Sequence, residues 1–321
     1  MAKSRGKQTT EHKSVVDAFV RSIIGGNIVT VGRMLSLIEN RDPMANEVMK
    51  RLYSRAGRAR VIGLTGSAGT GKSSLIDRMI VEFRRRKKLL GILTIDPSSP
   101  FSGGALLGDR LRMRDHFLDP GVFIRSLATR NGQGSLPSCV FAAAQLLDAM
   151  GKDYILIETI GIGQNQIDIA QIADIVVVVT TPAAGDEIQA LKAGVLEIAD
   201  ILVMNKSDLP GAEQMFSHLA ELFGATGLPV FKTSALQSHG IAPLIDGIEK
   251  RAAELNFDAK RTEKSLKISR AQMLALLRDQ LMARLEAKLD DHEIEQWTQR
   301  IADKHTDPYT AAEMILAKAG L

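Results

Sequence analysis

The amino-acid sequence predicts an α/β fold with a mostly parallel, doubly wound sheet, flanked by N-terminal helices and a C-terminal helical arm. Short apolar segments alternate with helical segments from residue 60 to 257, which is typical of a parallel sheet covered by helices. Outside this stretch, apolar residues recur only at helical spacing. We therefore expect an N-terminal helical extension (1–58), an α/β domain (59–257) and a C-terminal arm (258–321).

The N-terminal extension is expected to form helices over 11–56. The first helix has one apolar face over 15–24 and stops at Gly25-Gly26. The second covers 28–38. The third begins at Asp42-Pro43, where a capping side chain precedes a proline at the first helical position.

The α/β part begins at residue 60. Some of its apolar segments, such as 175–179, contain no polar residue, as strands buried on both faces of a parallel sheet require. Ligands of such sheets bind at the carboxyl ends of the strands. The expected strands are 60–65, 89–95, 122–127, 153–158, 174–180, 200–204 and 229–233.

After residue 257 no further strand pattern occurs. The charged segment 257–265 is expected to connect the α/β domain to the arm, and Asp307-Pro308 to begin a last short helix. Between them lies a stripe at helical spacing, made of Leu274, Leu277, Leu281 and Leu285. This stripe either packs on the body of the chain or buries against a second copy, and we expect a homodimer.

Composition excludes several classes of protein. Of the 321 residues, 45% are apolar and 24% are charged, which argues against wholesale disorder. No apolar run approaches the roughly 18 residues of a membrane span, and the basic N-terminus lacks the apolar core of a secretory signal. A single cysteine fits a reducing compartment. We expect a cytoplasmic protein with no membrane or nucleic-acid partner, because the basic run 84–88 is better explained as the cationic end of a helix.

A glycine-rich loop, GSAGTGKSS, follows the first expected strand. Its glycines allow a tight turn in which backbone N–H groups and the next helix N-terminus point at phosphates. Lys72 would add positive charge at the β/γ-phosphates, and the Ser73 hydroxyl could ligate Mg²⁺. The loop therefore predicts a P-loop site for a nucleoside triphosphate. Its expected binding residues are Gly66, Ser67, Ala68, Gly69, Thr70, Gly71, Lys72, Ser73 and Ser74.

The tetrapeptide Asn205-Lys206-Ser207-Asp208 after the strand 200–204 predicts the base. Asp208 can accept hydrogen bonds from both guanine N–H groups, whereas adenine offers no matching donors. One strand–helix unit later, the Ala235 N–H could reach the guanine O6. This order predicts GTP and GDP as ligands. The expected base-site residues are Asn205, Lys206, Asp208, Ser234, Ala235 and Leu236.

Three acidic residues, Asp96, Asp109 and Glu158, lie at or after strand ends between these motifs. A carboxylate beside a phosphate loop can hold Mg²⁺ or a water bound to it. For Asp96, which precedes a proline, turn formation is the alternative. Gly161 is placed to contact the γ-phosphate through its backbone, but Ile162 stands where a Ras-like GTPase has its water-orienting glutamine. We therefore expect slow hydrolysis by the isolated chain.

These motifs resemble those of the MeaB/ArgK-type GTPases, relatives of the methylmalonic aciduria type A protein. The resemblance covers nearly the whole chain. It implies a GTPase chaperone that gates adenosylcobalamin loading into, and protects, an adenosylcobalamin-dependent acyl-CoA mutase such as methylmalonyl-CoA mutase. It also implies a further partner, the adenosyltransferase that supplies this cofactor. It rests on the phosphate loop and on IDPSSP, LLGDRLRM, FIRSLATR, IETIGIGQ, GDEIQALKAGVLEIADILVMNKSD and DPYTAAEMILAKAGL.

The resemblance further implies roles for single residues. Residues 185–192 would form a switch in which Asp186 fixes the loop and Lys192 approaches the phosphates. Without the resemblance, Lys192 is an ordinary solvated lysine of a helix face. The sequence departs from the family pattern at 131–135 and at Ala184, which bears on switch geometry and on the partner mutase. The implied Mg²⁺ environment is Ser73, Asp96, Asp109 and Glu158, and the implied catalytic residues are Lys72, Glu158, Asp186 and Lys192.

Two other functions remain open on the sequence. A P-loop kinase or ATPase acting on a small molecule or a protein would use the same loop, but it leaves Asn205 and Asp208 unexplained. A nickel-insertion GTPase would need clustered His and Cys ligands. The six histidines are scattered along the sequence and Cys139 has no second cysteine to join it.

Overall fold

A computed structural model of the chain describes residues 2–97, 110–129, 138–159, 168–182, 196–224, 226–257, 259–289 and 291–320. It contains two compact units, Met1–Ser269 and Arg270–Leu321. The first unit contains the sheet and the N-terminal helices. None of the described helices is long and apolar enough to cross a membrane.

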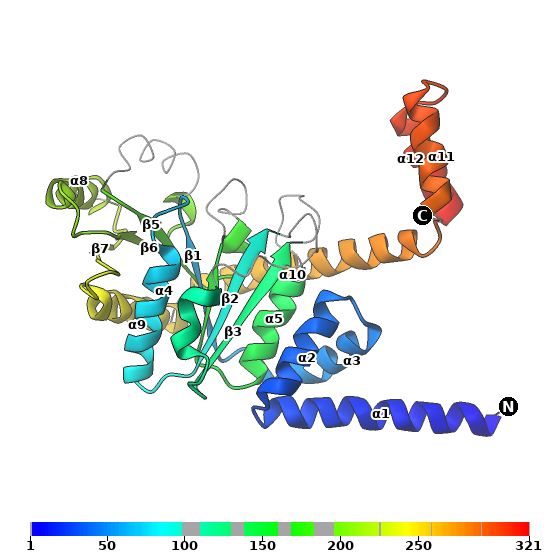
Figure 1. Ribbon diagram of the computed structural model, residues 1–321, viewed down its shortest axis with the longest axis horizontal. Coiled ribbons are helices and arrows are strands. Elements are labelled where there is room, and N and C mark those ends of the chain that lie inside the picture. The colour runs from blue at the N-terminus through cyan, green and yellow to red at the C-terminus, as the bar shows by residue number, and fades with distance from the viewer. Residues whose placement is uncertain are drawn as a thin grey trace. The chain divides into compact units, whose positions relative to one another are not determined.

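The first unit is built on a seven-stranded sheet in the order β3-β2-β4-β1-β5-β6-β7 (Figure 1). Every neighbouring pair is parallel, so the predicted α/β class is confirmed and the sheet is parallel throughout. All seven expected strands are present, with ends shifted by at most two residues. They are β1 (Arg60–Thr65), β2 (Leu90–Pro97), β3 (Val122–Thr129), β4 (Tyr154–Glu158), β5 (Ile175–Thr180), β6 (Ile201–Met204) and β7 (Val230–Lys232).

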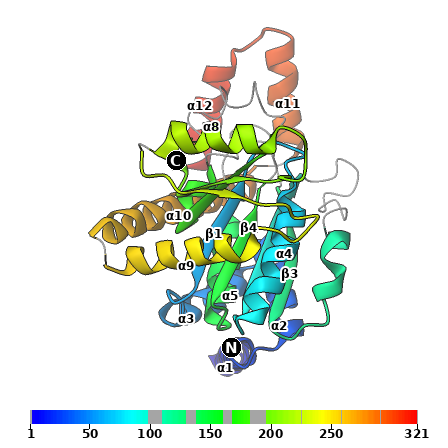
Figure 2. The ribbon, with the colours of Figure 1, turned by 90° about the vertical axis from the view of Figure 1, so that its left-hand side faces the viewer.

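Helices cover both faces of this sheet (Figures 1 and 2). Helices α4 (Lys72–Arg85) and α9 (Ile241–Phe257) pack on one face, and α5 (Ser138–Ala149) packs on the other. Helix α8 (Ala212–Gly224) contacts β7 at the sheet edge. Strand β5 is buried at every position, because helices exclude water from both faces of a central strand.

The N-terminal helices are α1 (Ala2–Ile24), α2 (Ile28–Glu39) and α3 (Pro43–Leu52). As predicted, the Asp42 carboxylate caps α3, accepting the Met44 N–H at 2.8 Å. Helix α1 begins at Ala2 rather than at residue 11. No proline interrupts the polar N-terminal segment, so the helix continues through it without the apolar spacing from which a helix is predicted.

An aspartate precedes each of the strands β4, β5 and β6: Asp153, Asp174 and Asp200. Their carboxylates accept the backbone N–H groups of Leu89, Val61 and Val176 at 2.7, 2.9 and 2.9 Å. These N–H groups lie at or near the start of neighbouring strands, where a parallel ladder leaves donors unpaired. The aspartates thus complete the hydrogen bonding at the edge of the sheet where the strands begin, the amino edge.

The C-terminal helices are α10 (Ala259–Glu286), α11 (Asp291–Ala302) and α12 (Pro308–Ala319). Residues 259–265 of the segment expected to connect the α/β domain to the arm are helical and form the first turns of α10. Its Ala, Lys, Arg and Glu residues favour helix, and Lys264 binds Asp200 at 2.9 Å. The predicted last helix is present, with the Asp307 carboxylate accepting two N–H groups of its first turn.

Candidate nucleotide-binding site

The glycine-rich loop lies between β1 and α4, at the edge of the sheet where the strands end, the carboxyl edge. Gly66 and Gly71 have φ angles of +142° and +86°, a region that disfavours other residues. A Cβ on Gly66 would lie 2.1 Å from the Val179 carbonyl oxygen, and one on Gly71 would lie 2.6 Å from Asn205 Nδ2. Conformation and lack of space both require glycine at these two positions.

Lys72 is the first residue of α4 and is buried. Its ammonium donates hydrogen bonds to the carbonyl oxygens of Gly66 and Ser67 at 2.8 and 2.9 Å. These bonds keep the ammonium at the loop that would surround the phosphates. Phosphate oxygens are stronger acceptors for a cation than neutral carbonyls, so a bound nucleotide would replace these contacts.

Ser73 and Glu158 meet at the base of the loop. The Ser73 hydroxyl donates to Glu158 Oε1 at 2.7 Å, and both residues are buried. The sheet explains the contact, because β4 lies beside β1 with Glu158 opposite Leu64. A hydroxyl and a carboxylate are oxygen ligands of the kind that Mg²⁺ binds. Asp96 lies on β2, the next strand beyond β4, at the same edge.

Asn205 joins the phosphate loop to the base motif. It is 1% exposed, and its Nδ2 donates to the Thr70 carbonyl at 2.9 Å. Its Oδ1 accepts from the Thr233 hydroxyl and from the Ala235 N–H, both at 3.1 Å. The Ala235 N–H, expected to face the guanine O6, thus donates to Asn205 in this structure. The Asn205 amide therefore links the base motif to the phosphate loop and to the segment 233–235.

Asp208 is fixed from one side. Its Oδ1 accepts the hydroxyl of buried Ser234 at 2.5 Å, and the same hydroxyl oxygen accepts the Gln237 N–H at 3.2 Å. Asp208 itself is exposed, so its carboxylate is both oriented and accessible. Leu236, which lies between Ser234 and Gln237 in the sequence, is 82% exposed. Lys206 adopts a φ of +59° at the turn between the two ends of the motif.

One contact of the site and one buried carboxyl were not predicted. Arg78 on α4 donates from Nε to the Ala235 carbonyl at 3.2 Å, tying the P-loop helix to the base loop. Asp168 is buried, and its Oδ2 has no hydrogen-bond partner among the described residues. Burial raises the pKa of the Asp168 carboxyl because it disfavours the charged form. Neither residue stands in a recognisable motif.

Several predicted residues lie outside the described parts of the chain. Among the described residues, no group of three or more His, Cys, Asp or Glu side chains could hold a metal ion. The predicted residues that are not described are Asp109, Gly161, Ile162, Ala184, Asp186, Lys192 and the segment 131–135.

A parallel sheet, a glycine loop opening a helix and an Asn–Lys–x–Asp turn held to that loop together define a P-loop protein of the guanine-nucleotide class. Over residues 31–290 the chain matches the family described as methylmalonyl-CoA mutase-associated GTPase MeaB. The chain belongs to this family.

Individual relatives agree with this assignment. A Pyrococcus abyssi protein that is named as a GTPase is 39% identical over 311 residues, 94% of this chain and 96% of that protein. The mitochondrial methylmalonic aciduria type A homolog of Caenorhabditis elegans is 33% identical over 60% of this chain and 52% of its own length. A crystal structure named LAO/AO transport system kinase shares the fold, with a TM-score of 0.66, 19% identity and coverage of 96% and 98% of the two chains.

Proposed function

We propose that this GTPase is a cytoplasmic chaperone that gates adenosylcobalamin loading into an adenosylcobalamin-dependent acyl-CoA mutase, such as methylmalonyl-CoA mutase, and protects that enzyme. The family description supports a mutase partner, and the similarity to a methylmalonic aciduria type A homolog agrees with it. The adenosyltransferase that supplies the cofactor is a further partner in this proposal. The observation that carries the nucleotide part is the Asn205 network between phosphate loop and base motif.

Hydrolysis would proceed by in-line attack of water on the γ-phosphorus of GTP. The new bond joins the water oxygen to phosphorus, the bond to the GDP oxygen breaks with its electron pair left on GDP, and the proton of the attacking water passes to bulk water. The Lys72 ammonium and the loop N–H groups would stabilise the charge that develops on the phosphate oxygens. Ser73 and Glu158, with Asp96 and Asp109, would hold Mg²⁺, which would supply positive charge to the phosphates during the reaction.

The isolated chain would hydrolyse GTP slowly. Ile162 occupies the position of the water-orienting glutamine of Ras-like GTPases, so this group must come from elsewhere. In the proposal it comes from 185–192, where Asp186 fixes the segment and Lys192 moves to the phosphates. A mutase that binds this arrangement better than the resting one would accelerate hydrolysis through that difference in affinity.

Paired single-turnover assays, with and without the mutase of the same cells, test this switch. We expect strong stimulation of the unmutated chain and little stimulation of Lys192→Ala, with unchanged GDP affinity. Lys250→Ala, which removes an exposed lysine of α9, is the matched control and should respond like the unmutated chain. Equal stimulation of Lys192→Ala would remove Lys192 from the mechanism.

The leucine stripe of α10 supports a homodimer. Leu274, Leu277 and Leu281 are 46%, 48% and 45% exposed in the single chain, and such an apolar stripe is stabilised when a second helix covers it. We expect Leu277→Lys/Leu281→Lys to be a monomer by light scattering. Leu276→Lys, at a leucine of the same helix that is 36% exposed and lies on the side opposite the stripe, should leave the dimer intact.

The two alternative functions predict different binding results. A kinase or ATPase would bind ATP at least as tightly as GTP, which competition between the two nucleotides measures. A nickel-insertion GTPase would retain Ni²⁺ in equilibrium dialysis at micromolar concentration.

A further inference from the structure

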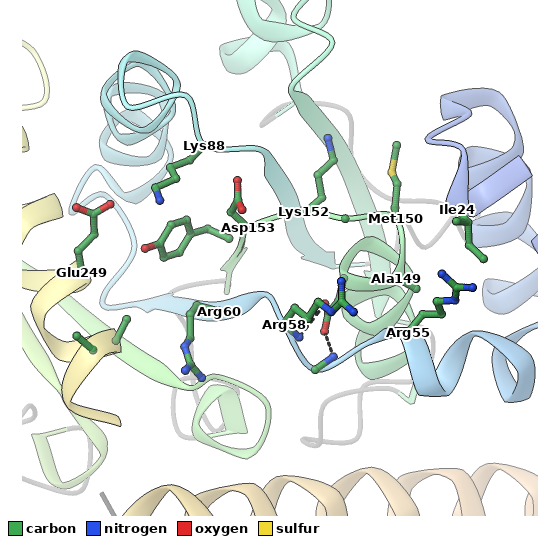
Figure 3. Close-up of a pocket in the computed structure, with 16 residues that line it drawn as sticks. Ile24, Arg55, Arg58, Arg60, Lys88, Ala149, Met150, Lys152, Asp153 and Glu249 are labelled. Carbon is green, nitrogen blue, oxygen red and sulfur yellow. Dashed lines mark hydrogen bonds between the residues drawn. The ribbon is translucent and has the colours of Figure 1, made fainter. Parts of the chain in front are cut away.

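A second pocket lies at the amino edge of the sheet, at the opposite ends of the strands from the phosphate loop (Figure 3). Its volume is about 790 Å³, within the range of roughly 300–1,000 Å³ that small-molecule sites occupy. The segment before β1, the end of α5, the start of β4 and helix α9 all contribute to its lining. None of the residues assigned to the nucleotide site lines it.

Basic side chains dominate the rim of this pocket. Arg55 and Arg58 come from the segment that leads into β1, Arg60 is the first residue of β1, and Lys88 comes from the segment before β2. Figure 3 shows Arg55 and Arg58 on one side of the pocket and Lys88 on the other. In the described parts of the chain, no acidic side chain forms an ion pair with Arg55, Arg58 or Lys88.

The acidic residues of the pocket are already engaged. The two Asp148 oxygens accept the backbone N–H groups of Gly57, Arg58 and Ala59 at 2.5, 3.2 and 3.0 Å. Asp153 accepts the Leu89 N–H at 2.7 Å, and Glu249 binds Arg86 at 2.8 Å. These bonds occupy the carboxylate oxygens and leave their negative charge in place, but the five basic side chains of the lining, which include Arg60 and Lys152, outnumber the three acids.

Asp148 also positions Arg58. By binding three successive N–H groups it fixes the turn at 57–59, and Gly57 supplies the φ of +99° that this turn requires. Arg58 is consequently carried on a constrained backbone, and Arg55 ends the short 3-10 helix Tyr53–Arg55, while both side chains remain exposed. Binding an anion there would cost less ordering than on a flexible loop.

We propose that this pocket binds a phosphate-bearing small molecule of nucleotide size, separate from the GTP site. The guanidinium group pairs with phosphate oxygens through two parallel hydrogen bonds, which Arg55 and Arg58 can provide, and Lys88 adds a third positive charge. The apolar part of the lining consists of Ile24, Ala149, Met150, Tyr154, Ala252 and Ala253. A concave site with few convergent charges suits a small ligand better than an extended polyanion.

Calorimetric titration of the full chain, saturated with GDP and Mg²⁺, tests the proposal with inorganic pyrophosphate and AMP as probes. We expect one additional site for at least one probe. Tighter binding of AMP would identify a nucleotide ligand, and tighter binding of pyrophosphate a ligand recognised through its phosphates alone. Arg55→Glu/Arg58→Glu should weaken that site roughly tenfold or more, because it removes the charged donors.

Two controls distinguish specific binding in this pocket from a general effect of charge or of misfolding. Lys50→Glu/Arg114→Glu changes the net charge equally at exposed residues outside the pocket and should leave the additional site unchanged. GDP affinity, measured on every variant, shows whether the chain is folded and the nucleotide site is intact, independently of the additional site. Failure to find the additional site would therefore not bear on the proposed GTPase function. No additional site at millimolar probe, or equal weakening in both double variants (an adventitious ion only), would overturn the proposal.

Discussion

The two edges of the sheet use polar side chains in different ways. At the carboxyl edge, buried polar groups bind one another across segments distant in sequence, as Ser73 does with Glu158 and Asn205 with Thr70 and Ala235. At the amino edge, aspartates bind backbone N–H groups at the starts of neighbouring strands. The first arrangement builds a ligand site in advance, and the second completes the sheet. Substitutions at the two edges should therefore have different consequences.

Gly66→Ala should have the largest effect. The added Cβ would lie 2.1 Å from the Val179 carbonyl oxygen at a φ of +142°, so the loop must move or the fold must yield, at about 3–5 kcal/mol. Gly69→Ala is the matched control, because its Cβ would meet nothing within 4 Å. Urea unfolding should show a loss of only about 1 kcal/mol for the control. Equal losses for the two variants would contradict the crowding seen at Gly66.

Asn205→Ala sharpens the comparison between the edges. It leaves the buried Thr70 carbonyl and Ala235 N–H without this partner, which should lower the free energy of unfolding by about 3 kcal/mol. Asp153→Ala at the amino edge removes one bond from an exposed carboxylate and should cost about 1 kcal/mol. GDP affinity should fall only for Asn205→Ala. A fall of similar size for Asp153→Ala would mean that the edges are not independent.

Lys152, at the amino edge, should make the stability of the chain depend on pH. The side chain is 5% exposed, and its ammonium donates to the Gly121 carbonyl at 3.1 Å. Burial, with a smaller contribution from the charge of Arg84, lowers the pKa of Lys152 to about 8. Between about pH 8 and 10.5 the unfolded chain keeps a proton that the folded chain has lost, so stability rises with pH over this window.

Lys152→Met should abolish that rise. Between pH 8 and 9.5 the unmutated chain should gain up to about 2 kcal/mol relative to the variant in urea unfolding. The Gly121 carbonyl keeps the Leu90 N–H at 2.8 Å in the variant, so no acceptor is left unpaired. Lys250→Met, at an exposed position, controls for the loss of a lysine. If the free energy of unfolding changed with pH in the same way for the unmutated chain and Lys152→Met, the lowered pKa would not belong to Lys152.

The carboxyl edge was largely predictable from sequence because its residues stand in fixed spacing around a glycine loop. Glu158 ends β4, and Ser73 follows the loop at the end of β1. Their contact can therefore be predicted as soon as β4 is placed beside β1. The order of strands was not predictable, because parallel crossovers leave it open. The Asp–strand pairing at 153, 174 and 200 has a visible signal, an aspartate directly before each apolar run.

Other features had no local signal. Arg78 is one of many helix-face arginines, and only the tertiary fold brings it to the Ala235 carbonyl. The amino-edge pocket joins residues from five separate segments, with Asp148 and Gly57 some ninety positions apart. The segment 257–265 looked like a linker because it is charged, yet charge with Ala, Lys and Glu also favours helix. Its contact with Asp200 is again tertiary.

Guanine selectivity tests the central claim most directly, because it depends on the accessible carboxylate that Ser234 orients. Calorimetry should show that the unmutated chain prefers GDP over ADP by at least about 100-fold. Asp208→Asn should reduce this preference to below roughly tenfold without changing stability, because one acceptor becomes a donor. Glu213→Gln, at an acid of α8 that is 78% exposed, should keep the full preference. An unmutated chain that binds ADP as tightly as GDP would contradict the account.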